Sequence, residues 1–338
     1  MAQLDNHNVG YAVALLTKSF CACMLKRLSK RLGGSNHCQS AKHPSLYSAP
    51  NNEKFWNRLE WQREVEMMYS YRPVQSPKLQ PELHHPGYIY REYVPSRQLA
   101  SHIACYWTMD FQAGAGNPWH RILPDGCVHI IVDLHSPSYG KAAFVDGLST
   151  RYKVLHFTKA RSVFGIRLYS ESARAFLKYP LSAFVGRHVF LEEIWGVDGR
   201  LMAEEIMAAN TASDIIAIVE RKLSQMLACS DMSTPSLVYQ STQYMYEFKG
   251  NLSVTDLAEK VNFSERHLRR AFVRELGVSP KEMLGIVRFQ SLLQEFSSGG
   301  YSSLTDLALK YGYYDQSHFA KDFARYYGLP LKRITKKG

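Results

Sequence analysis

Three arginines lie within five residues near the C-terminal end of the chain, at Arg266, Arg269 and Arg270, with Arg274 one turn further along. A guanidinium group can grip O6 and N7 of guanine with two parallel hydrogen bonds, or it can hold a phosphate. Cations clustered in this way beside an apolar helix face are difficult to explain as a solvated surface alone. We therefore predict that these arginines contact nucleic acid.

A second group of residues with base-reading chemistry follows further along the chain. It consists of Gln316, Ser317, Ala320 and Lys321. Glutamine can pair with adenine, serine and lysine can hold phosphates or bases, and alanine can touch a thymine methyl group. Because the two groups differ in chemistry, we expect them to read two different halves of an asymmetric DNA site.

An internal repeat positions both groups, since "VTDLAEKV" at residues 254–261 returns as "LTDLALKY" at residues 304–311. Each copy predicts a helix, a tight turn and a second helix. This is the helix-turn-helix motif, whose second helix lies in the DNA major groove. The copies span about 252–276 and 303–327. The residues expected to cap or end their helices are Ser253, Ser264 and Gly277 in the first copy and Ser303, Asp315 and Gly328 in the second.

The second helix of each copy has an apolar face opposite its polar residues. A linking helix at about 280–298 joins the two copies. We expect it to separate them by about one DNA turn, on the order of 34 Å. The apolar positions are Leu268, Phe272 and Leu276 in the first copy, and Phe319, Phe323 and Tyr326 or Tyr327 in the second.

Residues 86–170 have the spacing of strands interrupted by turns. After the turn Pro124-Asp125-Gly126, the period of two predicts that alternate residues share a face. His120, Cys127 and His129 are therefore candidates for a soft-metal site or a reactive thiol. No second ligand pair is placed to close a tetrahedral site, so we expect no metal, no cofactor and no catalytic residue. The two faces are Val128, Ile130, Val132 and Leu134, and Cys127, His129, Ile131, Asp133 and His135.

Residues 171–227 change to helical spacing. One apolar stripe within them repeats at alternating intervals of four and three. The stripe favours packing on its own domain, and a partner helix in a homodimer is the alternative. A short polar segment with a proline, at 228–235, predicts a linker. The stripe consists of Ala212, Ile216, Val219, Leu223 and Met226.

Positive charge is concentrated at both ends of the chain, whose net charge is +11. Residues 1–80 contain 11 Lys and Arg against 5 Asp and Glu, residues 81–235 contain 15 of each, and residues 236–338 contain 15 against 10. A basic C-terminal region is typical of a nucleic-acid-binding domain. The sequence has no Gly-rich phosphate loop, paired-carboxylate motif or nucleophile elbow, so we do not expect an enzyme.

Residues 1–85 are rich in Ser, Asn, Lys and His and predict a disordered extension. We expect the natural start of the protein near Met67, which would make residues 1–66 additional to it. The six cysteines are scattered without a CxxC pair, and no apolar run is long enough to span a membrane. These features predict a cytoplasmic protein with no membrane contact.

Residues 236–338 resemble, over their whole length, the DNA-binding domain of AraC/XylS-type transcriptional regulators. The resemblance includes an opening helix "SLVYQSTQYMYEF", the first motif, the linking helix "GVSPKEMLGIVRFQSLLQEF" and the second motif "LALKYGYYDQSHFAKDFARYYGLP". The family usually has proline three residues after the second glycine, where this chain has Leu331, after Pro330. The resemblance implies two sets of reading positions. They are Arg266, Arg269 and Arg270 in the first recognition helix, and Gln316, Ser317, Ala320 and Lys321 in the second.

The middle region is similar to the N-terminal domain of one branch of these regulators, through fragments such as "RILPDGCVHIIVDL" and "FGIRLYSESARAFLKYPLSAF". By analogy it is β-rich and binds an effector or a partner. The resemblance therefore implies an α+β multidomain protein. A β-rich sensor domain at 86–227 precedes an all-α domain at 236–338 made of two helix-turn-helix units.

We expect a sequence-specific regulator, an activator controlled by its N-terminal domain, that binds a double-stranded DNA operator in the bacterial nucleoid. RNA polymerase, a small-molecule effector and a second copy of the chain are the other partners that the resemblance leaves open. The alternatives are a metal or thiol sensor, or a small-molecule enzyme, fused to a DNA-binding module. A regulator controlled only by its own abundance is a further alternative.

Overall fold

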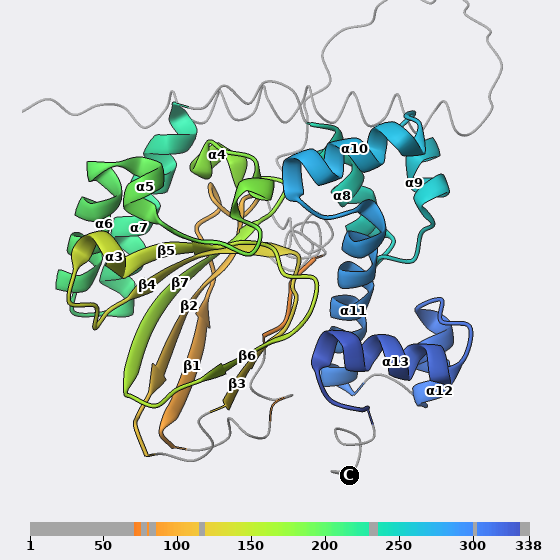
Figure 1. The fold of residues 1–338 in the computed structure, drawn as a ribbon, viewed down its shortest axis with the longest axis horizontal. Coiled ribbons are helices and arrows are strands. Elements are labelled where there is room, and N and C mark those ends of the chain that lie inside the picture. The colour runs from red at the N-terminus through yellow and green to blue at the C-terminus, as the bar shows by residue number, and fades with distance from the viewer. Residues whose placement is uncertain are drawn as a thin grey trace, which may run out of the picture. The chain divides into compact units, whose positions relative to one another are not determined.

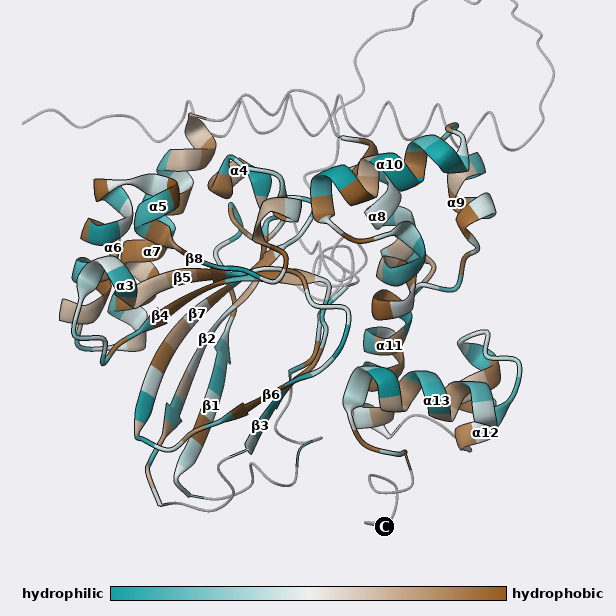
Figure 2. Cartoon of the chain, in the orientation of Figure 1, coloured by the Kyte–Doolittle hydropathy of each residue, from teal (hydrophilic) through white to brown (hydrophobic). Residues whose placement is uncertain are grey.

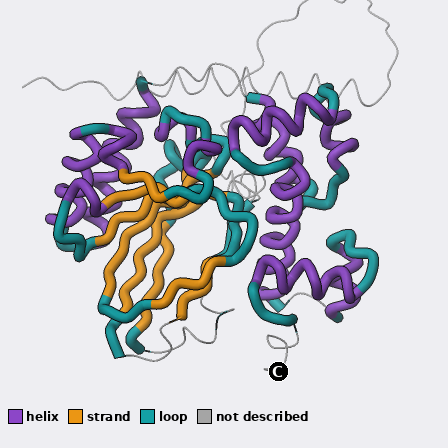
Figure 3. Tube along the Cα trace, in the orientation of Figure 1, coloured by secondary structure: helices purple, strands orange, loops and turns teal. Residues whose placement is uncertain are grey.

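The computed structural model describes residues 71–75, 80, 86–114, 119–229, 236–299 and 303–331. All of them lie in one compact unit that spans residues 57–338. Among these residues, every strand precedes residue 191, and the chain from Leu237 onward forms only helices and turns (Figures 1 and 3). The expected fold class, a β-rich region followed by an all-α region, is confirmed.

A six-stranded sheet forms the centre of the β-rich region. Its order is β1-β2-β7-β4-β5-β8, and every neighbouring pair is antiparallel. The alternation of buried and partly exposed residues along β4 follows the expected period of two. The strands are β1 (Tyr88–Tyr93), β2 (Ile103–Phe111), β4 (Cys127–Asp133), β5 (Ala143–Asp146), β7 (Arg161–Tyr169) and β8 (His188–Phe190).

Apolar residues of the sheet and of the helices beside it form one core. Val128, Ile130 and Val132 are fully buried, and they share this core with Val219 and Leu223. The apolar stripe of α7 (Ala212–Ala228) therefore packs on its own domain. Figure 2 shows hydrophobic residues along the strands of the six-stranded sheet. The helices are α3 (Tyr139–Ala142), α4 (Arg174–Leu177), η3 (Leu181–Phe184), α5 (Leu191–Trp195), α6 (Val197–Ala208) and α7 (Ala212–Ala228).

A separate two-stranded ribbon consists of β3 (Trp119–Ile122) and β6 (Lys153–His156). The strands are antiparallel, with His120 opposite Leu155. Both of these residues line a cavity whose other walls come mostly from the six-stranded sheet. The ribbon thus closes one side of a hollow within the β-rich region.

The C-terminal region is organised around α11 (Pro280–Ser298), which matches the expected linking helix. Ser279 caps its start, with proline at the first helical position, and Gly299 ends it. No helix among the described residues is long and apolar enough to cross a membrane. The other helices are α8 (Leu237–Glu247), α9 (Val254–Lys260), α10 (Glu265–Leu276), α12 (Leu304–Lys310) and α13 (Gln316–Tyr327).

The short segment 71–75 corrects one expectation, because it was expected to belong to a disordered extension reaching residue 85. Tyr71 is buried, its ring stacks on Tyr246 at 4.3 Å, and its hydroxyl donates a hydrogen bond to the Asp125 carbonyl at 2.7 Å. Gln80 is buried as well and accepts a hydrogen bond from the backbone of Arg121. A tyrosine and a glutamine in a polar stretch gave no periodic signal, so the sequence could not show that they pack. The expected start near Met67 lies outside the described residues.

Candidate nucleic-acid interface

The residues expected to cap the motif helices occupy those positions. Ser253 and Ser264 accept hydrogen bonds from backbone N–H groups of the first turns of α9 and α10, at 3.0 and 3.3 Å. Ser303 and Asp315 do the same for α12 and α13, at 3.0 and 2.6 Å. Gly277 and Gly328 end α10 and α13 with φ of 76° and 83°, a conformation that favours glycine. Local sequence chemistry therefore fixes where each recognition helix begins and ends.

The apolar faces of α10 and α13 are buried as predicted. Leu268 and Phe319 are both 0% exposed, and they occupy matching positions in the two copies. This match aligns the copies residue by residue, so Arg270 of α10 corresponds to Lys321 of α13. The other buried residues are Ala271, Phe272 and Leu276 in α10, and Phe323, Tyr326 and Tyr327 in α13.

The four arginines of α10 differ in what their guanidinium groups contact. Arg269 pairs with Glu265 at 3.0 Å and Arg274 with Glu275 at 2.8 Å. Arg266 and Arg270 are exposed and have no ion-pair partner among the described residues. They lie four residues apart and therefore on the same face of the helix. Of the predicted group, Arg266 and Arg270 are the two with guanidinium groups free to contact a base or a phosphate.

Val273 extends this face and was not among the predicted residues. It lies three residues after Arg270, and 53% of its surface is exposed although it is apolar. An exposed apolar side chain between arginines can contact a thymine methyl group. The spacing from Arg266 through Arg270 to Val273 is the helical i, i+4, i+7 pattern, which could have identified it.

The predicted residues of α13 lie beside a groove. Gln316, Ser317 and Lys321 are exposed and Ala320 is partly buried. Gln316, Ser317 and Ala320 line the groove together with Leu304 at the start of α12. Leu331, which stands where the family usually has proline, closes the groove and is buried.

Two further exposed residues of the second motif could contact DNA and were not among the predicted residues. Tyr314, directly before the capping residue of α13, is 90% exposed. Arg325 is exposed and corresponds in the alignment to Arg274 of α10. An exposed aromatic ring at the start of a recognition helix gives no periodic signal, whereas Arg325 could have been found from the repeat.

The three metal or thiol candidates of the β-rich region are not brought together. Cys127 is 2% exposed and belongs to the main core, so its thiol is not accessible to a metal ion or a reagent. Burial raises the pKa of the Cys127 thiol well above its usual value, which disfavours a thiolate. His120 binds the Tyr88 hydroxyl through Nδ1 at 3.0 Å, and His129 bonds Asp125 through Nε2 at 2.9 Å. Within the described ranges, no three Cys, His, Asp or Glu residues could hold a metal ion together.

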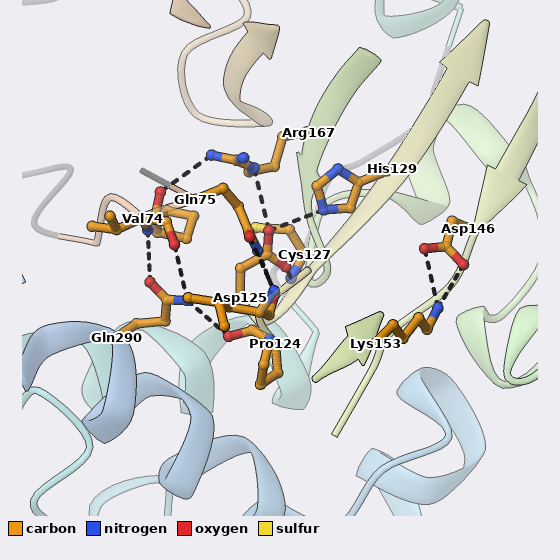
Figure 4. Close-up of polar contacts among 12 residues, drawn as sticks. Val74, Gln75, Pro124, Asp125, Cys127, His129, Asp146, Lys153, Arg167 and Gln290 are labelled. Atoms are coloured by element: carbon orange, nitrogen blue, oxygen red, sulfur yellow. Dashed lines mark hydrogen bonds and ion pairs between the residues drawn. The ribbon is translucent and has the colours of Figure 1, made fainter. Parts of the chain in front are cut away.

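A cluster of buried charged residues lies at the N-terminal end of β4 (Figure 4). The Oδ2 atom of Asp125 lies 2.9 Å from Nε2 of His129 and 3.2 Å from Nε of Arg167. Burial alone would raise the pKa of Asp125, but His129 and Arg167, with the backbone N–H of Cys127, outweigh it and lower the pKa to about 2. Arg167 also pairs with Glu92 at 3.0 Å. The cluster is therefore charged and internally paired.

One buried side chain of the linking helix α11 forms hydrogen bonds with this part of the β-rich region. Gln290 is 0% exposed, and its amide bonds the backbone N–H of Val74 at 2.6 Å and the carbonyl of Pro124 at 2.8 Å (Figure 4). Pro124 immediately precedes Asp125 of the ionic cluster. A buried amide thus hydrogen-bonds the turn before β4 to the helix between the two motifs, and Met283 of the same helix lies beside Gly126 of that turn.

The described chain thus contains two helix-turn-helix units, joined by one helix and preceded by a β-rich region. Comparison with protein families assigns residues 257–337 to a family described as "Helix-turn-helix domain". Residues 91–190 match a second family, described as "Domain of unknown function (DUF6597)". The first match covers most of both motifs and the second covers most of the six-stranded sheet.

Similar proteins include two operon regulators. The lactose operon transcription activator of Staphylococcus xylosus is 30% identical over 80 residues, 24% of this chain and 28% of the relative. The Msm operon regulatory protein of Streptococcus mutans is 25% identical over 135 residues, 40% of this chain and 48% of the relative. The chain thus spans less than half the length of both relatives. Among solved structures, ToxT of Vibrio cholerae is 13% identical with a TM-score of 0.34, over 73% of this chain and 98% of ToxT.

Proposed function

We propose that the chain is a sequence-specific transcriptional regulator that places α10 and α13 in two successive major grooves of one DNA duplex. The observation that carries the proposal is the matched pair of motifs, with Arg266 and Arg270 on one recognition helix and Ser317 and Lys321 at the corresponding positions of the other. Their buried faces are alike and their exposed faces differ. One scaffold therefore presents two different readers to DNA.

The finer parts of the proposal concern control and partners. We propose that the domain formed by residues 86–227 controls DNA binding, that 228–235 links it to the domain at 236–338, and that the regulator acts as an activator in the cytoplasm. The two similar proteins, an operon transcription activator and an operon regulatory protein, support this direction. The cavity beside the β3–β6 ribbon supports a small-molecule effector, because it is the kind of hollow that holds such ligands.

Selection of duplexes from a random pool by the full chain tests the proposal. We expect the selected sequences to contain two unlike conserved elements, with centres about 10 base pairs apart, because the two readers differ and the grooves repeat with that period. Affinity for the selected duplex should fall steeply with salt, since phosphate contacts release counterions. Recovery of sequences with no shared element, or with one element alone, would contradict the proposal.

A deletion experiment separates regulation from binding alone. Expression near the selected sites should fall when the gene is deleted if the protein activates, and should rise if it represses. Unchanged expression next to occupied sites would show a DNA-binding protein that does not regulate.

A further inference from the structure

Strand β3 divides two environments, because its alternate residues face opposite sides. His120 and Ile122 line the cavity of the β-rich region. Arg121, between them, places its guanidinium carbon 5.5 Å from the ring centroid of Tyr327 at the end of α13. Leu123 lies two residues after Arg121 and directly after the end of β3. It is 2% exposed and lies in the apolar cluster formed by α11, α12 and α13. One short strand is therefore a wall of the cavity and a support of the second motif.

The strand paired with β3 has the same double role. Leu155 of β6 lines the cavity. Tyr152, directly before β6, lies against Gly328, where an added β-carbon would meet its ring at 2.6 Å. Gln75 also lines the cavity, and its amide pairs with both backbone groups of Leu123, accepting from the N–H at 3.0 Å. A change in the cavity wall would therefore shift residues that touch α13.

The first motif is held by a different part of the β-rich region. Ser182 of η3 donates a hydrogen bond to the carbonyl of Arg274 at 2.7 Å, and Val185 packs against Gly277. Neither residue is among those that line the cavity. Buried residues of the first motif also share the main core with the six-stranded sheet, and no cavity-lining residue belongs to that core. The cavity wall therefore contacts the second motif directly, whereas the first motif is held by other parts of the β-rich region.

The cavity is lined mostly by apolar and aromatic side chains, and its volume is about 100 Å³. The charged residues around it are already paired. Arg167 pairs with Asp125 and Glu92, Lys153 with Asp146 and Arg161 with Asp133. Burial, with a smaller effect of Arg121, lowers the pKa of His120 to about 4, so this ring is neutral at pH 7. A charged ligand would find no free counter-ion here and would lose its hydration.

One donor in the cavity wall is unused. The indole Nε1 of Trp107 is buried and has no hydrogen-bond partner among the described residues. Trp107 lies across Gly165 of the neighbouring strand, where a β-carbon would be 2.0 Å from the ring. A buried donor without a partner favours a ligand that supplies an acceptor.

From these observations we propose that the cavity binds an uncharged, ring-containing ligand with a hydrogen-bond acceptor. We further propose that β3 and β6 transmit its binding to α12–α13 and leave α9–α10 unaffected. The inference rests on the proposed function only in treating α13 as a DNA reader. A ligand whose affinity differs between two positions of the ribbon must change the populations of those positions, and contacts through Arg121, Leu123 and Tyr152 extend the change to α13.

The ligand class is tested by fluorescence titration of the full chain with prodan, an uncharged naphthyl ketone. Anilinonaphthalenesulfonate, an anion with a related ring system, is the matched probe. We expect prodan to bind at least about tenfold more tightly than the anion, because a buried charge without a partner is costly. Trp107→Phe should weaken prodan binding by about three- to tenfold, as for one lost hydrogen bond. Equal binding of both probes, no prodan binding, or an unchanged Trp107→Phe variant would overturn the ligand assignment.

Transmission is tested by hydrogen–deuterium exchange of the full chain with and without prodan, in the absence of DNA. We expect prodan to change amide exchange in α12 and α13 by several-fold and to leave α9 and α10 unchanged. Arg121→Ala and Tyr152→Ala should keep prodan binding and lose this change. Equal changes in both motifs, or a full change in both variants, would overturn the inference. Because no DNA is present, these outcomes are independent of whether the chain proves to regulate transcription.

Discussion

Arg266 and Arg270 differ from Arg269 and Arg274 although all four belong to one helix and one residue type. The latter two are held by Glu265 and Glu275. An arginine already paired with a carboxylate must give up that contact before it can bind a phosphate or a guanine. The residue types in the sequence therefore identified the helix face. The ion pairs in the structure identify which of its arginines are available to bind DNA.

Replacement of Arg270 by alanine should weaken binding to the selected duplex by about 1–3 kcal/mol and relax the preference at one base pair, if the side chain reads a base. Arg200→Ala is the matched control, because Arg200 is an exposed arginine of α6 outside both motifs. Competition binding against single-base variants of the duplex measures both effects. A uniform loss over all sequences would assign Arg270 to a phosphate, and no loss relative to Arg200→Ala would remove it from the interface.

Glu171 gives the chain a pH-dependent stability. It is buried, and its Oε2 accepts a hydrogen bond from the Tyr246 hydroxyl of α8 at 2.9 Å. Burial raises the pKa of Glu171 from 4.5 to about 7, although hydrogen bonds from its own backbone, Tyr246 and Ser170 act in the opposite direction. The folded state therefore holds this proton over a pH range in which the unfolded state has lost it. The free energy of unfolding must fall as pH rises from about 4.5 to 7.

Chemical unfolding of the full chain at pH 5 and pH 8 checks this prediction. The loss of stability should be larger in the wild type than in Glu171→Gln, by a difference on the order of 3 kcal/mol, because the amide does not ionise. His102 and His120, whose pKa values burial lowers, change stability in the opposite direction in both proteins and cancel in the comparison. Identical pH profiles would show that Glu171 is not held protonated.

At the scale of elements, the caps of the recognition helices can be tested individually. Ser264→Ala removes the acceptor for a first-turn N–H of α10, and should cost about 1 kcal/mol in the free energy of unfolding. Ser264→Asp should retain the stability, since aspartate caps equally well. Denaturant unfolding of the three proteins measures the differences, and equal loss in both variants would indicate a role of the hydroxyl other than capping.

The helical region could be predicted closely because its signals are local. Pro280 and Gly299 mark the ends of α11, and Ser264 and Gly277 mark those of α10. Each of these residues acts on its own helix through one hydrogen bond or one backbone angle, so no knowledge of distant residues is needed. The repeat adds a second, independent copy of the same signals.

The β-rich region could be predicted only in part, because its organisation depends on contacts between distant residues. The period of two along β4 correctly assigned Val128, Ile130 and Val132 to the core. The same rule placed Cys127 on the opposite face, but Tyr71 and the ionic cluster also cover that face at its start, so the thiol is buried. No spacing in the sequence indicates that residue 71 would lie beside residue 127.

At the scale of the whole molecule, Gln290 makes a contact between distant parts of the chain. The sequence pattern alone would predict it to be an ordinary helix position. Its side chain bonds Val74, 216 positions before it in the chain, and Pro124, 166 positions before it. Gln290→Ala should lower the free energy of unfolding by about 1–3 kcal/mol, because the N–H of Val74 and the carbonyl of Pro124 would be buried without partners. Gln294→Ala is a control in the next turn, since Gln294 bonds the Arg72 carbonyl but is more exposed. Thermal unfolding that is equal for both variants would contradict a special role for Gln290.

The most direct measurement is missing-nucleoside interference on the duplex selected by the full chain. We predict two clusters of required bases, about one helical turn apart on the same side of the duplex. Arg270→Ala should erase required bases from one cluster only, and Lys321→Ala from the other only. A single cluster, or the loss of both clusters from either substitution, would contradict the placement of two recognition helices in successive major grooves.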